Sequence, residues 1–496
     1  MPSTFPRVIV LLTMFVTSLC ASSAEAEKIT GTDWPQFRGP GAMGRSDAKD
    51  VPLNWSDEKN IVWKTALPGP GASSPITLGN RIFITCFTGY ATSSREPGDM
   101  ANLKRHLLCL NFADGKIVWN TPTAAELPEQ DRIRESHGYA SSTPVADNER
   151  IYTFYGKSGV FAFDHSGKQL WRANVGDKLN GWGSATSPVL YKNLLIVNAS
   201  IESDSLVALD KKTGKEVWRA SGASESWHAP VFVAAPDGKD EIVIAKNGRV
   251  LGFDPENGAS LWSVKTGIPW YMCPTPVAEN GIAYVIGGRT PNGALAIRAG
   301  GRGDVTASHV VWKLNKGSNV PSPVLHDGHL YFAHENLGII YCVNSKTGEV
   351  VYEERLEPSP GQIYASPVLA DGKIYFTGRG GRTVVIAAKP KFERLADNTL
   401  ESNRGVFNST PALEPNALLH WRMTRHAALG VGCGAELIEL VTHERQPFAV
   451  GRPRRHIDRA LSAKELGEHF DPAGLKREHP QHYVFVLGMT FHGRFV

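Results

Sequence analysis

The fold of this chain is decided by a repeated pattern, whose most regular copy reads Leu206-Val207-Ala208-Leu209-Asp210-Lys211-Lys212-Thr213-Gly214-Lys215-Glu216-Val217-Trp218. Two short apolar runs flank a polar turn. In that turn Asp210 can accept hydrogen bonds from backbone N–H groups, and Gly214 can supply the positive φ that a tight turn demands. Both runs are too short for a helix, so the stretch predicts two strands joined by a turn.

The same pattern recurs along the chain with a period in the forties. The copies are aligned by prolines that follow a small or hydroxylated residue: Pro75, Pro144, Pro188, Pro230, Pro276, Pro323, Pro367 and Pro411. From Pro144 onward the spacings are 44, 42, 46, 47, 44 and 44 residues, and the first is 69 because Thr88 to Leu103 is an insertion. Each period holds four short runs of strand-forming residues, which indicates one four-stranded propeller blade per repeat.

Large aromatic residues end the outer strand of the repeats and are expected to fill the space between blades. They are Trp63, Trp119, Trp171, Trp218, Trp262, Trp312 and Tyr352, and Leu395 takes this place in a degenerate copy, which makes eight outer-strand ends. Small residues one strand further in, such as Ala162, Ala208 and Gly252, would make room for them. Cys109 and Cys342 stand at this small position, so we interpret them as buried side chains rather than reactive thiols.

The first strand-like run belongs with the last repeat. Eight prolines and eight outer-strand ends agree only if residues 61–64 form the outer strand of the blade that begins near Pro411. The two ends of the domain would then pair, and no sheet edge would stay open. The sequence therefore predicts an all-β, eight-bladed propeller of four-stranded antiparallel blades over residues 61–433, closed by an N-terminal strand.

Two motifs give the chain a family resemblance. The blade pattern resembles the pyrroloquinoline-quinone-like (PQQ-like) repeat. The segment Trp34-Pro35-Gln36-Phe37-Arg38-Gly39-Pro40 is similar to a signature that precedes this repeat in many exported bacterial propellers. The resemblance covers about residues 33–413 and implies a quinoprotein-alcohol-dehydrogenase-like propeller with tryptophan docking between blades. More distantly, the chain resembles the outer-membrane-assembly propeller lipoproteins.

The N-terminus predicts export. Arg7 precedes an apolar run and then small residues, the order of a secretory signal peptide over residues 1–26. The run, Val8 to Cys20, has 13 residues and is too short to span a bilayer. We expect an exported protein, periplasmic or extracellular, without a transmembrane segment and monomeric. Residues 27–60 then form an arm that carries the Trp34 motif.

Composition narrows the partners. The chain is 42% hydrophobic with 12 tryptophans, enough for a large core. Its 53 basic and 49 acidic residues are interspersed rather than grouped in a stripe, so we expect no nucleic-acid partner.

The C-terminal segment does not follow the repeat. Residues 434–496 form an atypical tail, either disordered or partly helical, with a plausible short helix over 458–470. From His420 onward the chain carries eight of its 16 histidines. Imidazole binds zinc or copper, but the spacings give no compact pair with a carboxylate, so no metal site is predicted. A shifted reading frame or a foreign appendage is the favoured interpretation.

Candidate ligand-binding residues lie on the loops that lead into the innermost strands, here called the mouth loops, because such loops ring one end of a propeller channel. The candidates are His137, Tyr139, Trp182, Trp227, His228, Trp270, Tyr271, Tyr364 and Asn408. Their aromatic faces could stack a quinone, a sugar or a peptide. Alternatively, these aromatics wedge between the blade tops and plug the channel.

Catalysis is not indicated. The resemblance implies a quinone held between a tryptophan and a disulfide of adjacent cysteines, with calcium and an aspartate base. No two cysteines are adjacent here, and the nearest acids, Glu135 and Glu225, fit solvated loop positions. We therefore predict no catalytic residue, cofactor or metal, and a binding or scaffold module for an envelope protein, peptide or glycan. The alternatives are a PQQ-dependent alcohol or sugar dehydrogenase with calcium, and a purely structural envelope protein.

Overall fold

The structure is a computed structural model. It describes residues 33–92, 96–131, 133, 137–289, 291–400, 405–424 and 436–442, with the backbone alone at 421–424, 436, 437 and 439. The expected signal peptide, Glu135, the possible helix over 458–470 and the histidines that follow His420 lie outside the described residues.

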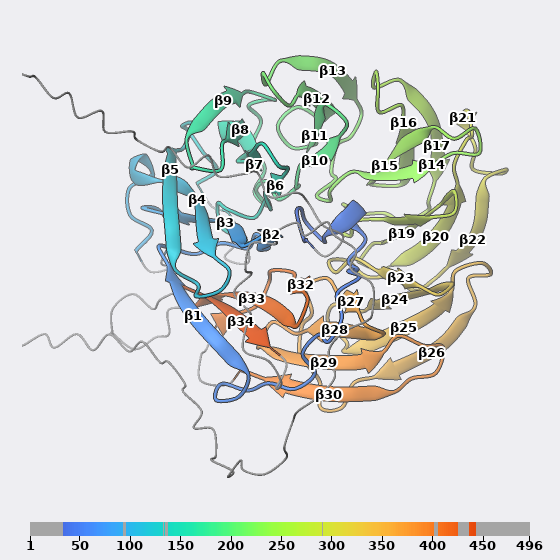
Figure 1. Cartoon of the computed structure of the whole chain (residues 1–496). Helices are drawn as coiled ribbons and strands as arrows, with labels where there is room; N and C mark the ends of the chain where they lie inside the picture. The colour runs from blue at the N-terminus through green and yellow to red at the C-terminus, as the bar shows by residue number, and fades with distance from the viewer. Residues whose placement is uncertain are drawn as a thin grey trace, which may run out of the picture.

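Eight antiparallel sheets are arranged as blades around a ring (Figure 1). Every innermost strand begins one residue after a repeat proline, from β2 after Pro75 to β32 after Pro411. Proline lacks the N–H that a sheet ladder requires, so it stands just outside the strand. The predicted eight-bladed, all-β propeller is confirmed.

The first four blades run from β2 to β17. Blade 1 holds β2 (Ile76–Leu78), β3 (Arg81–Thr88), β4 (Lys104–Asn111) and β5 (Ile117–Ala124). Blade 2 holds β6 (Val145–Ala146), β7 (Ile151–Phe154), β8 (Val160–Phe163) and β9 (Gln169–Ala173). Blade 3 holds β10 (Val189–Tyr191), β11 (Leu194–Ala199), β12 (Ser205–Asp210) and β13 (Glu216–Ser221). Blade 4 holds β14 (Val231–Ala234), β15 (Asp240–Lys246), β16 (Arg249–Phe253) and β17 (Ser260–Lys265).

The remaining blades complete the ring. Blade 5 holds β18 (Val277–Glu279), β19 (Ile282–Gly287), β20 (Gly293–Arg298) and β22 (Val310–Leu314). Blade 6 holds β23 (Val324–His326), β24 (His329–Ala333), β25 (Ile339–Asn344) and β26 (Val350–Arg355). Blade 7 holds β27 (Val368–Ala370), β28 (Lys373–Thr377), β29 (Arg382–Ala387) and β30 (Arg394–Thr399). Blade 8 holds β32 (Ala412–Glu414), β33 (Ala417–Thr424), β34 (Glu436–Thr442) and β1 (Ile61–Leu67), while β31 (Gly405–Val406) also pairs with β33.

The ring closes by mixing the two ends of the domain. Strand β1 pairs antiparallel with β34, with Trp63 opposite Leu440, and β34 pairs in turn with β33. The expected closure is therefore present. However, β34 lies beyond residue 433, where we expected the tail to begin, so blade 8 continues to Thr442. Its sequence, Glu-Leu-Ile-Glu-Leu-Val-Thr, is rich in apolar residues but lacks the turn and tryptophan that mark the other blades.

Tryptophans join neighbouring blades in a repeated way. The indole N–H of each donates to a carbonyl in the outer turn of the next blade: Trp63 to Phe112 (3.0 Å), Trp119 to His165 (3.0 Å), Trp171 to Lys211 (3.2 Å), Trp218 to Pro255 (3.1 Å) and Trp312 to Ser345 (2.8 Å). The turn glycine sits under the ring. At Gly214, where φ is 72°, a Cβ would stand 2.6 Å from the ring of Trp171, so both the backbone and the joint demand glycine.

The joint between blades 4 and 5 departs from this rule. A longer segment that includes β21 (Gly303–Asp304), which adds to the edge of β17, stands where the tight turn would be. Trp262 instead donates to Glu241 Oε2 of its own blade at 2.7 Å. As expected, a small residue makes room, because a Cβ on Gly252 would come within 2.1 Å of the Trp262 ring.

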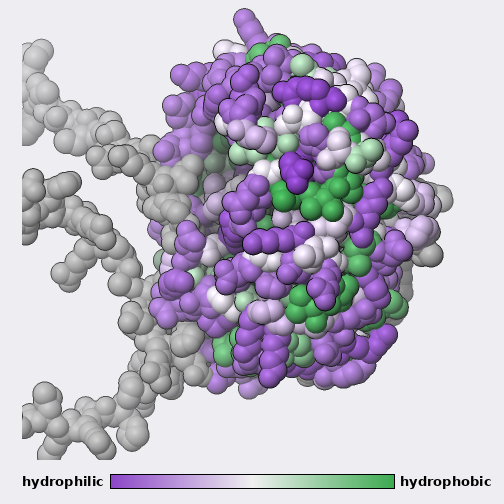
Figure 2. Space-filling view, turned by 90° about the vertical axis from the view of Figure 1, so that its right-hand side faces the viewer, coloured by the Kyte–Doolittle hydropathy of each residue, from purple (hydrophilic) through white to green (hydrophobic). Residues whose placement is uncertain are grey.

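The outer surface is mostly hydrophilic, with separate hydrophobic patches on the side shown in Figure 2. Within the described part of the chain, no helix is long and apolar enough to cross a membrane. Helical structure there consists of the 3-10 turns η1 (Pro40–Ala42), η2 (Met100–Asn102) and η3 (Gly156–Ser158). Cys109 and Cys342 are buried opposite Trp119 and Tyr352, as expected, and burial raises the pKa of each thiol to about 12.

Candidate functional site

One end of the central channel is closed by the N-terminal arm, which lies across the centre of the ring (Figure 1). The arm continues the sheets of several blades inward. Thr77 N–H donates to the carbonyl of Trp34 and Ala146 N–H to that of Pro35, both at 2.9 Å. In blade 7, Leu369 N–H donates to the carbonyl of Gly44 at 2.8 Å.

The Trp34 motif folds into a compact plug. Gly39 has a φ of 68°, and a Cβ there would lie 2.5 Å from the Trp34 ring. Arg38 is completely buried, and its guanidinium donates to the carbonyls of Met43 (3.1 Å) and Pro323. Burial lowers the pKa of Arg38 to about 9. This packing gives the motif a structural role at the closed end.

A ring of hydroxyls surrounds the channel above the plug. The backbone N–H of each residue that precedes a repeat proline donates to the hydroxyl of its counterpart in the next blade. The links are Ser74 to Thr143 (2.8 Å), Thr143 to Ser187 (3.0 Å), Thr275 to Ser322 (2.9 Å), Ser322 to Ser366 (3.0 Å), Ser366 to Thr410 (3.1 Å) and Thr410 to Ser74 (2.9 Å). This hydroxyl ring opens at blade 4, where Ala229 has no hydroxyl and Thr275 Oγ1 is buried without a partner.

The other end of the channel opens into a cavity of about 270 Å³. Phe37 of the arm and the hydroxyl ring form part of its lining. One wall is aromatic: Tyr271 lies with its ring centroid 5.3 Å from those of both Trp182 and Trp227. The indole of Trp227 is fixed by donation to Gly183 O at 2.8 Å, and its backbone N–H donates to Met272 O at 2.7 Å.

The opposite wall is a chain of polar side chains from blades 6 to 8. Arg379 donates to Asn408 Oδ1 (2.9 Å) and to Gln362 Oε1 (2.7 Å), and Gln362 donates to Asn336 Oδ1 (2.9 Å). Asn336 donates to Glu335 Oε1 (3.1 Å), whose other oxygen accepts the backbone N–H of Asn319 (3.0 Å). The guanidinium carbon Cζ of Arg379 lies 4.3 Å from the ring centroid of Tyr364. The cavity therefore has one aromatic side and one side of amides and charges.

The structure brings six of the nine candidates together in the cavity lining: His137, Trp182, Trp227, Tyr271, Tyr364 and Asn408. Trp270 stands at the rim, 39% exposed, with the guanidinium of Arg289 5.9 Å from its ring. Its φ of 110° is unusual for a bulky residue, and such conformations concentrate at ligand sites.

The other two candidates have structural surroundings. His228 is buried: Nδ1–H donates to the carbonyl of its neighbour Ala229 at 2.8 Å, and Nε2 accepts Ala245 N–H at 2.9 Å. Burial lowers the pKa of His228. Tyr139 is also buried, and its hydroxyl donates to Gln130 O at 2.5 Å. Of the nearest acids, Glu225 is exposed and bonded to Asn247, outside the cavity lining.

Sequence reasoning missed much of the cavity. It omitted Phe37, because an arm that returns to the channel leaves no local signal. It also omitted the polar wall, whose members Asn319, Glu335, Asn336 and Gln362 look like ordinary loop residues. For Asn319 and Gln362, the available signal was their place between a blade's outer strand and the next repeat proline.

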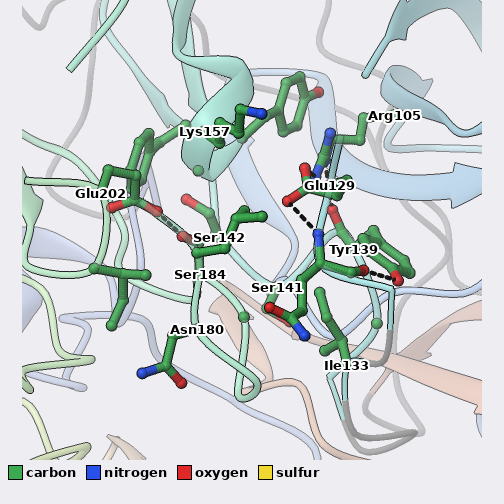
Figure 3. A pocket seen from close by; sticks show the side chains of 18 of the residues that line it. Arg105, Glu129, Ile133, Tyr139, Ser141, Ser142, Lys157, Asn180, Ser184 and Glu202 are labelled. Carbon is green, nitrogen blue, oxygen red and sulfur yellow. Dashed lines mark hydrogen bonds and ion pairs between the residues drawn. The ribbon is translucent and has the colours of Figure 1, made fainter. Parts of the chain in front are cut away.

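A second, smaller pocket of about 20 Å³ lies beside the mouth, between blades 1 to 3 (Figure 3). Its Arg105–Glu129 ion pair is buried, with 2.5 Å between Nη2 and Oε2. Burial raises the pKa of Glu202 to about 8, and this carboxyl accepts a hydrogen bond from Ser184. Because Ser184 follows Trp182 by two residues, Glu202 holds the loop that carries part of the aromatic wall.

Comparison with known proteins places the chain in a family. The family model described as outer membrane protein assembly factor BamB matches residues 100–233 and 246–392, more than half of the chain. The chain belongs to this family. The resemblance to PQQ-like propellers is thereby confirmed. The similarity of the Trp34 motif to the signature of exported bacterial propellers stays a prediction.

Two relatives illustrate the range of functions in similar chains. Tetrathionate hydrolase of Acidithiobacillus ferrooxidans is 24% identical over 324 residues, covering 60% of this chain and 61% of that protein. Outer membrane protein assembly factor BamB of Burkholderia pseudomallei is 24% identical over 236 residues, covering 46% and 50%. The match thus spans only about half to three-fifths of these relatives.

Solved structures share the fold. Quinohemoprotein alcohol dehydrogenase from Comamonas testosteroni matches with a TM-score of 0.59 at 9% identity, over 87% of this chain and 85% of that one. A europium-containing methanol dehydrogenase has a TM-score of 0.57 at 11% identity, and the match covers 83% of this chain and 98% of that one. BamB from Moraxella catarrhalis has a TM-score of 0.51 at 13% identity, and the match covers 78% of this chain and 98% of that one. At these identities the likeness shows the fold alone.

The cavity does not fit PQQ with calcium. Among the described lining residues, Glu335 is the single carboxylate, and both of its oxygens already accept N–H groups. Calcium prefers six to eight oxygen ligands, and no second carboxylate stands ready as a base. No disulfide joins the described cysteines, and none neighbours another in sequence. Within the described residues, no group of three or more His, Cys, Asp or Glu could hold a metal ion.

Proposed function

We propose that this chain is an exported, non-catalytic binding module of the cell envelope, and that its ligand occupies the open mouth of the channel. The observation that carries the proposal is the asymmetry of the channel. The arm seals one end with backbone hydrogen bonds, while the other end opens into a cavity of about 270 Å³. A blind, aromatic cavity with a few convergent polar groups is the usual form of a small ligand site.

The shape of the aromatic wall supports binding over a plug. Side chains that plug a channel pack to the density of a protein interior and leave few voids. Here Trp182, Trp227 and Tyr271 are only half-buried, and Trp270 extends into solvent at the rim. Exposed aromatic area of this kind is disfavoured unless a partner covers it.

The family supports a partner in the envelope. Relatives are described as outer membrane protein assembly factors, and that description belongs to them. For this chain we propose an envelope protein, peptide or glycan as the source of the ligand, in a periplasmic or extracellular setting. The dehydrogenase alternative has the fold in its favour but not the lining of the cavity.

Capture from an envelope extract tests this function. The full chain is immobilised beside a Trp182→Ala/Tyr271→Ala double variant, whose thermal unfolding is measured first. We expect wild type to retain envelope material that the variant loses. If the variant unfolds more easily but retains the same material, the aromatics are a plug and the proposal is wrong. Turnover in a dye-linked dehydrogenase assay with added PQQ and calcium would contradict the non-catalytic assignment.

A further inference from the structure

We propose that the cavity binds one neutral sugar ring, free or at the end of a glycan. This inference rests on the proposed function, because it names the ligand class of the same mouth. Four features of the cavity carry it: its size, its charge, the hydroxyls of its floor and its two unlike walls.

Size restricts the ligand to a small ring. Pockets for drug-sized molecules have volumes of about 300 to 1,000 Å³. A cavity of about 270 Å³ lies just below that range. Because the arm closes the far end, a chain cannot thread through the channel. A folded domain or a helix therefore cannot enter, whereas a single ring at the end of a longer molecule can.

Charge favours a neutral ligand. The described lining contains one arginine, Arg289, one histidine, His137, and one carboxylate, Glu335. Arg379 lies behind Tyr364 and is already bonded to Asn408 and Gln362. A molecule with several carboxylates would meet Glu335 without enough free cations, and a cationic ligand would meet the two arginines. An uncharged ligand avoids both penalties.

The floor offers hydrogen-bond donors. The oxygens of Ser74, Ser187, Ser322, Ser366 and Thr410 each accept a backbone N–H within the hydroxyl ring, and all five residues line the cavity. No acceptor for their hydroxyl protons is found among the described residues. A hydroxyl that has accepted one bond can still donate its proton. The floor therefore suits a ligand with several oxygen atoms.

The two walls match the two sides of a pyranose. Its axial C–H groups form an apolar face that can lie on one of the rings of Trp182, Trp227 and Tyr271, which are tilted against one another by 51° and 67°. Its equatorial hydroxyls point sideways, toward the amides of Asn336 and Gln362 on the opposite wall. A neutral quinone would use the aromatic faces but offers no hydroxyl donors to those amide oxygens. Unlike a quinone, the sugar ring satisfies floor and walls together.

Titration of the full chain with defined sugars tests the inference. The probes are the methyl α- and β-glycosides of glucose, galactose, mannose and N-acetylglucosamine, up to about 10 mM. PQQ with calcium and a pool of blocked tripeptides are titrated in parallel. Intrinsic tryptophan fluorescence and calorimetry are the readouts. We expect at least one glycoside to bind with one site per chain and to change the fluorescence.

Three variants locate the binding. Trp182→Ala should weaken it about tenfold or more, because a stacking face is lost. Trp182→Phe keeps a flat face and should stay within about threefold, so it covers the case in which the alanine variant is unstable. Val217→Ala is the control: its side chain is 53% exposed on the outer strand β13, away from the cavity lining, and affinity should not change.

The outcomes separate this inference from the proposed function. Binding of PQQ or tripeptides at this site without any glycoside overturns the sugar and leaves the mouth as a site. Glycoside binding that is indifferent to Trp182→Ala lies elsewhere, and the inference is wrong. If no glycoside binds, the sugar assignment also fails, while the envelope capture experiment still judges the binding function on its own.

Discussion

The two ends of the channel belong to the same propeller but show opposite chemistry. At the closed end, Trp34 and Arg38 are 0% exposed, and the arm continues the blades with backbone hydrogen bonds. At the open end, Trp182 and Tyr271 are half-buried, and Trp270 is 39% exposed with a φ of 110°. The closed end buries the chain's own side chains and pairs backbone groups, although Trp34 Nε1 and Arg38 Nε and Nη1 are buried without a partner among the described residues. The open end leaves aromatic surface uncovered.

The difference teaches where to look for function. Residues that stabilise a fold bury their surface and satisfy their polar atoms, and their replacement lowers stability. Residues kept for a ligand can be removed at little cost to the free chain. Substitutions at the closed end should therefore change the free energy of unfolding, and those at the open end should change binding.

The largest effect that tests this contrast is expected from replacing two glycines in the arm by alanine, one at a time. Gly39 and Gly41 have similar φ values, 68° and 63°, but the ψ of Gly39, −156°, lies in a region that is essentially open to glycine alone, whereas the ψ of Gly41, 12°, does not. A Cβ at Gly39 would meet the Trp34 ring at 2.5 Å, whereas one at Gly41 meets its nearest neighbour, on Met43, at 3.5 Å. Gly39→Ala should cost about 3 kcal/mol and Gly41→Ala about 1 kcal/mol in denaturant unfolding. Equal losses would mean that the plug does not pack as described.

The second prediction concerns pH. Burial raises the pKa of Glu414, at the closed end, and of Glu202, beside the mouth, to about 8 from an ordinary value of 4.5. Between these values the folded state binds more protons than the unfolded state. This contribution to stability is fully present below about pH 4.5 and is lost as the pH rises through 8.

The window from pH 7 to 8 lies above 6.5, the ordinary pKa of the buried histidines His106, His228 and His420, whose pKa burial lowers. Stability should fall there by up to about 1.4 kcal/mol per pH unit for each glutamate. Glu414→Gln, which can still accept from Thr77, should remove about half of the slope, and Glu202→Gln the other half. Chemical denaturation across the window measures it. An unchanged slope in Glu414→Gln contradicts a buried, neutral carboxyl at the closed end.

The third prediction compares two members of the hydroxyl ring. Ser322→Ala strands the buried N–H of Thr275 and should cost about 1.5 kcal/mol. Thr275→Val removes a hydroxyl whose oxygen has no partner, so it should leave stability within about 0.5 kcal/mol or raise it. Both are read from denaturant midpoints. A larger loss in Thr275→Val than in Ser322→Ala would show that the ring does not open at blade 4.

The smallest effect on stability is expected at the rim. Trp270→Ala should change the free energy of unfolding by less than about 0.5 kcal/mol, because the side chain is largely solvated and lies outside the cavity lining. Thermal unfolding of the variant beside wild type is sufficient. A loss as large as that of Gly39→Ala would erase the contrast between the two ends.

Most of the propeller could be predicted from the sequence, because its determinants are local. A proline precedes each innermost strand, and a turn glycine faces the tryptophan of the preceding blade, as Gly214 faces Trp171. Closure followed from counting strands. Strand β34 was not predicted, since it lacks the tryptophan and turn that mark an outer hairpin and follows residues that break the repeat.

The cavity was predicted on one side only. Aromatic residues such as Trp182 and Tyr271 are rare enough in loops to be noticed, whereas Asn336 and Gln362 are common loop residues. The polar wall arises when three blades meet, and the plug arises when a remote arm returns to the axis. His228 and Tyr139 show the converse error: residue type alone does not tell whether a loop side chain faces the channel or the interior of a blade.

Native-state hydrogen exchange of the full chain tests the central claim, that one end of the channel is sealed and the other open. The amides of Thr77, Ala146 and Leu369 donate to the arm, whereas those of Trp182 and Trp270 donate only to nearby loop side chains. We predict that the first three exchange only through global unfolding and the last two through small local openings. Arm-bonded amides that exchange as fast as those of the mouth would contradict the account.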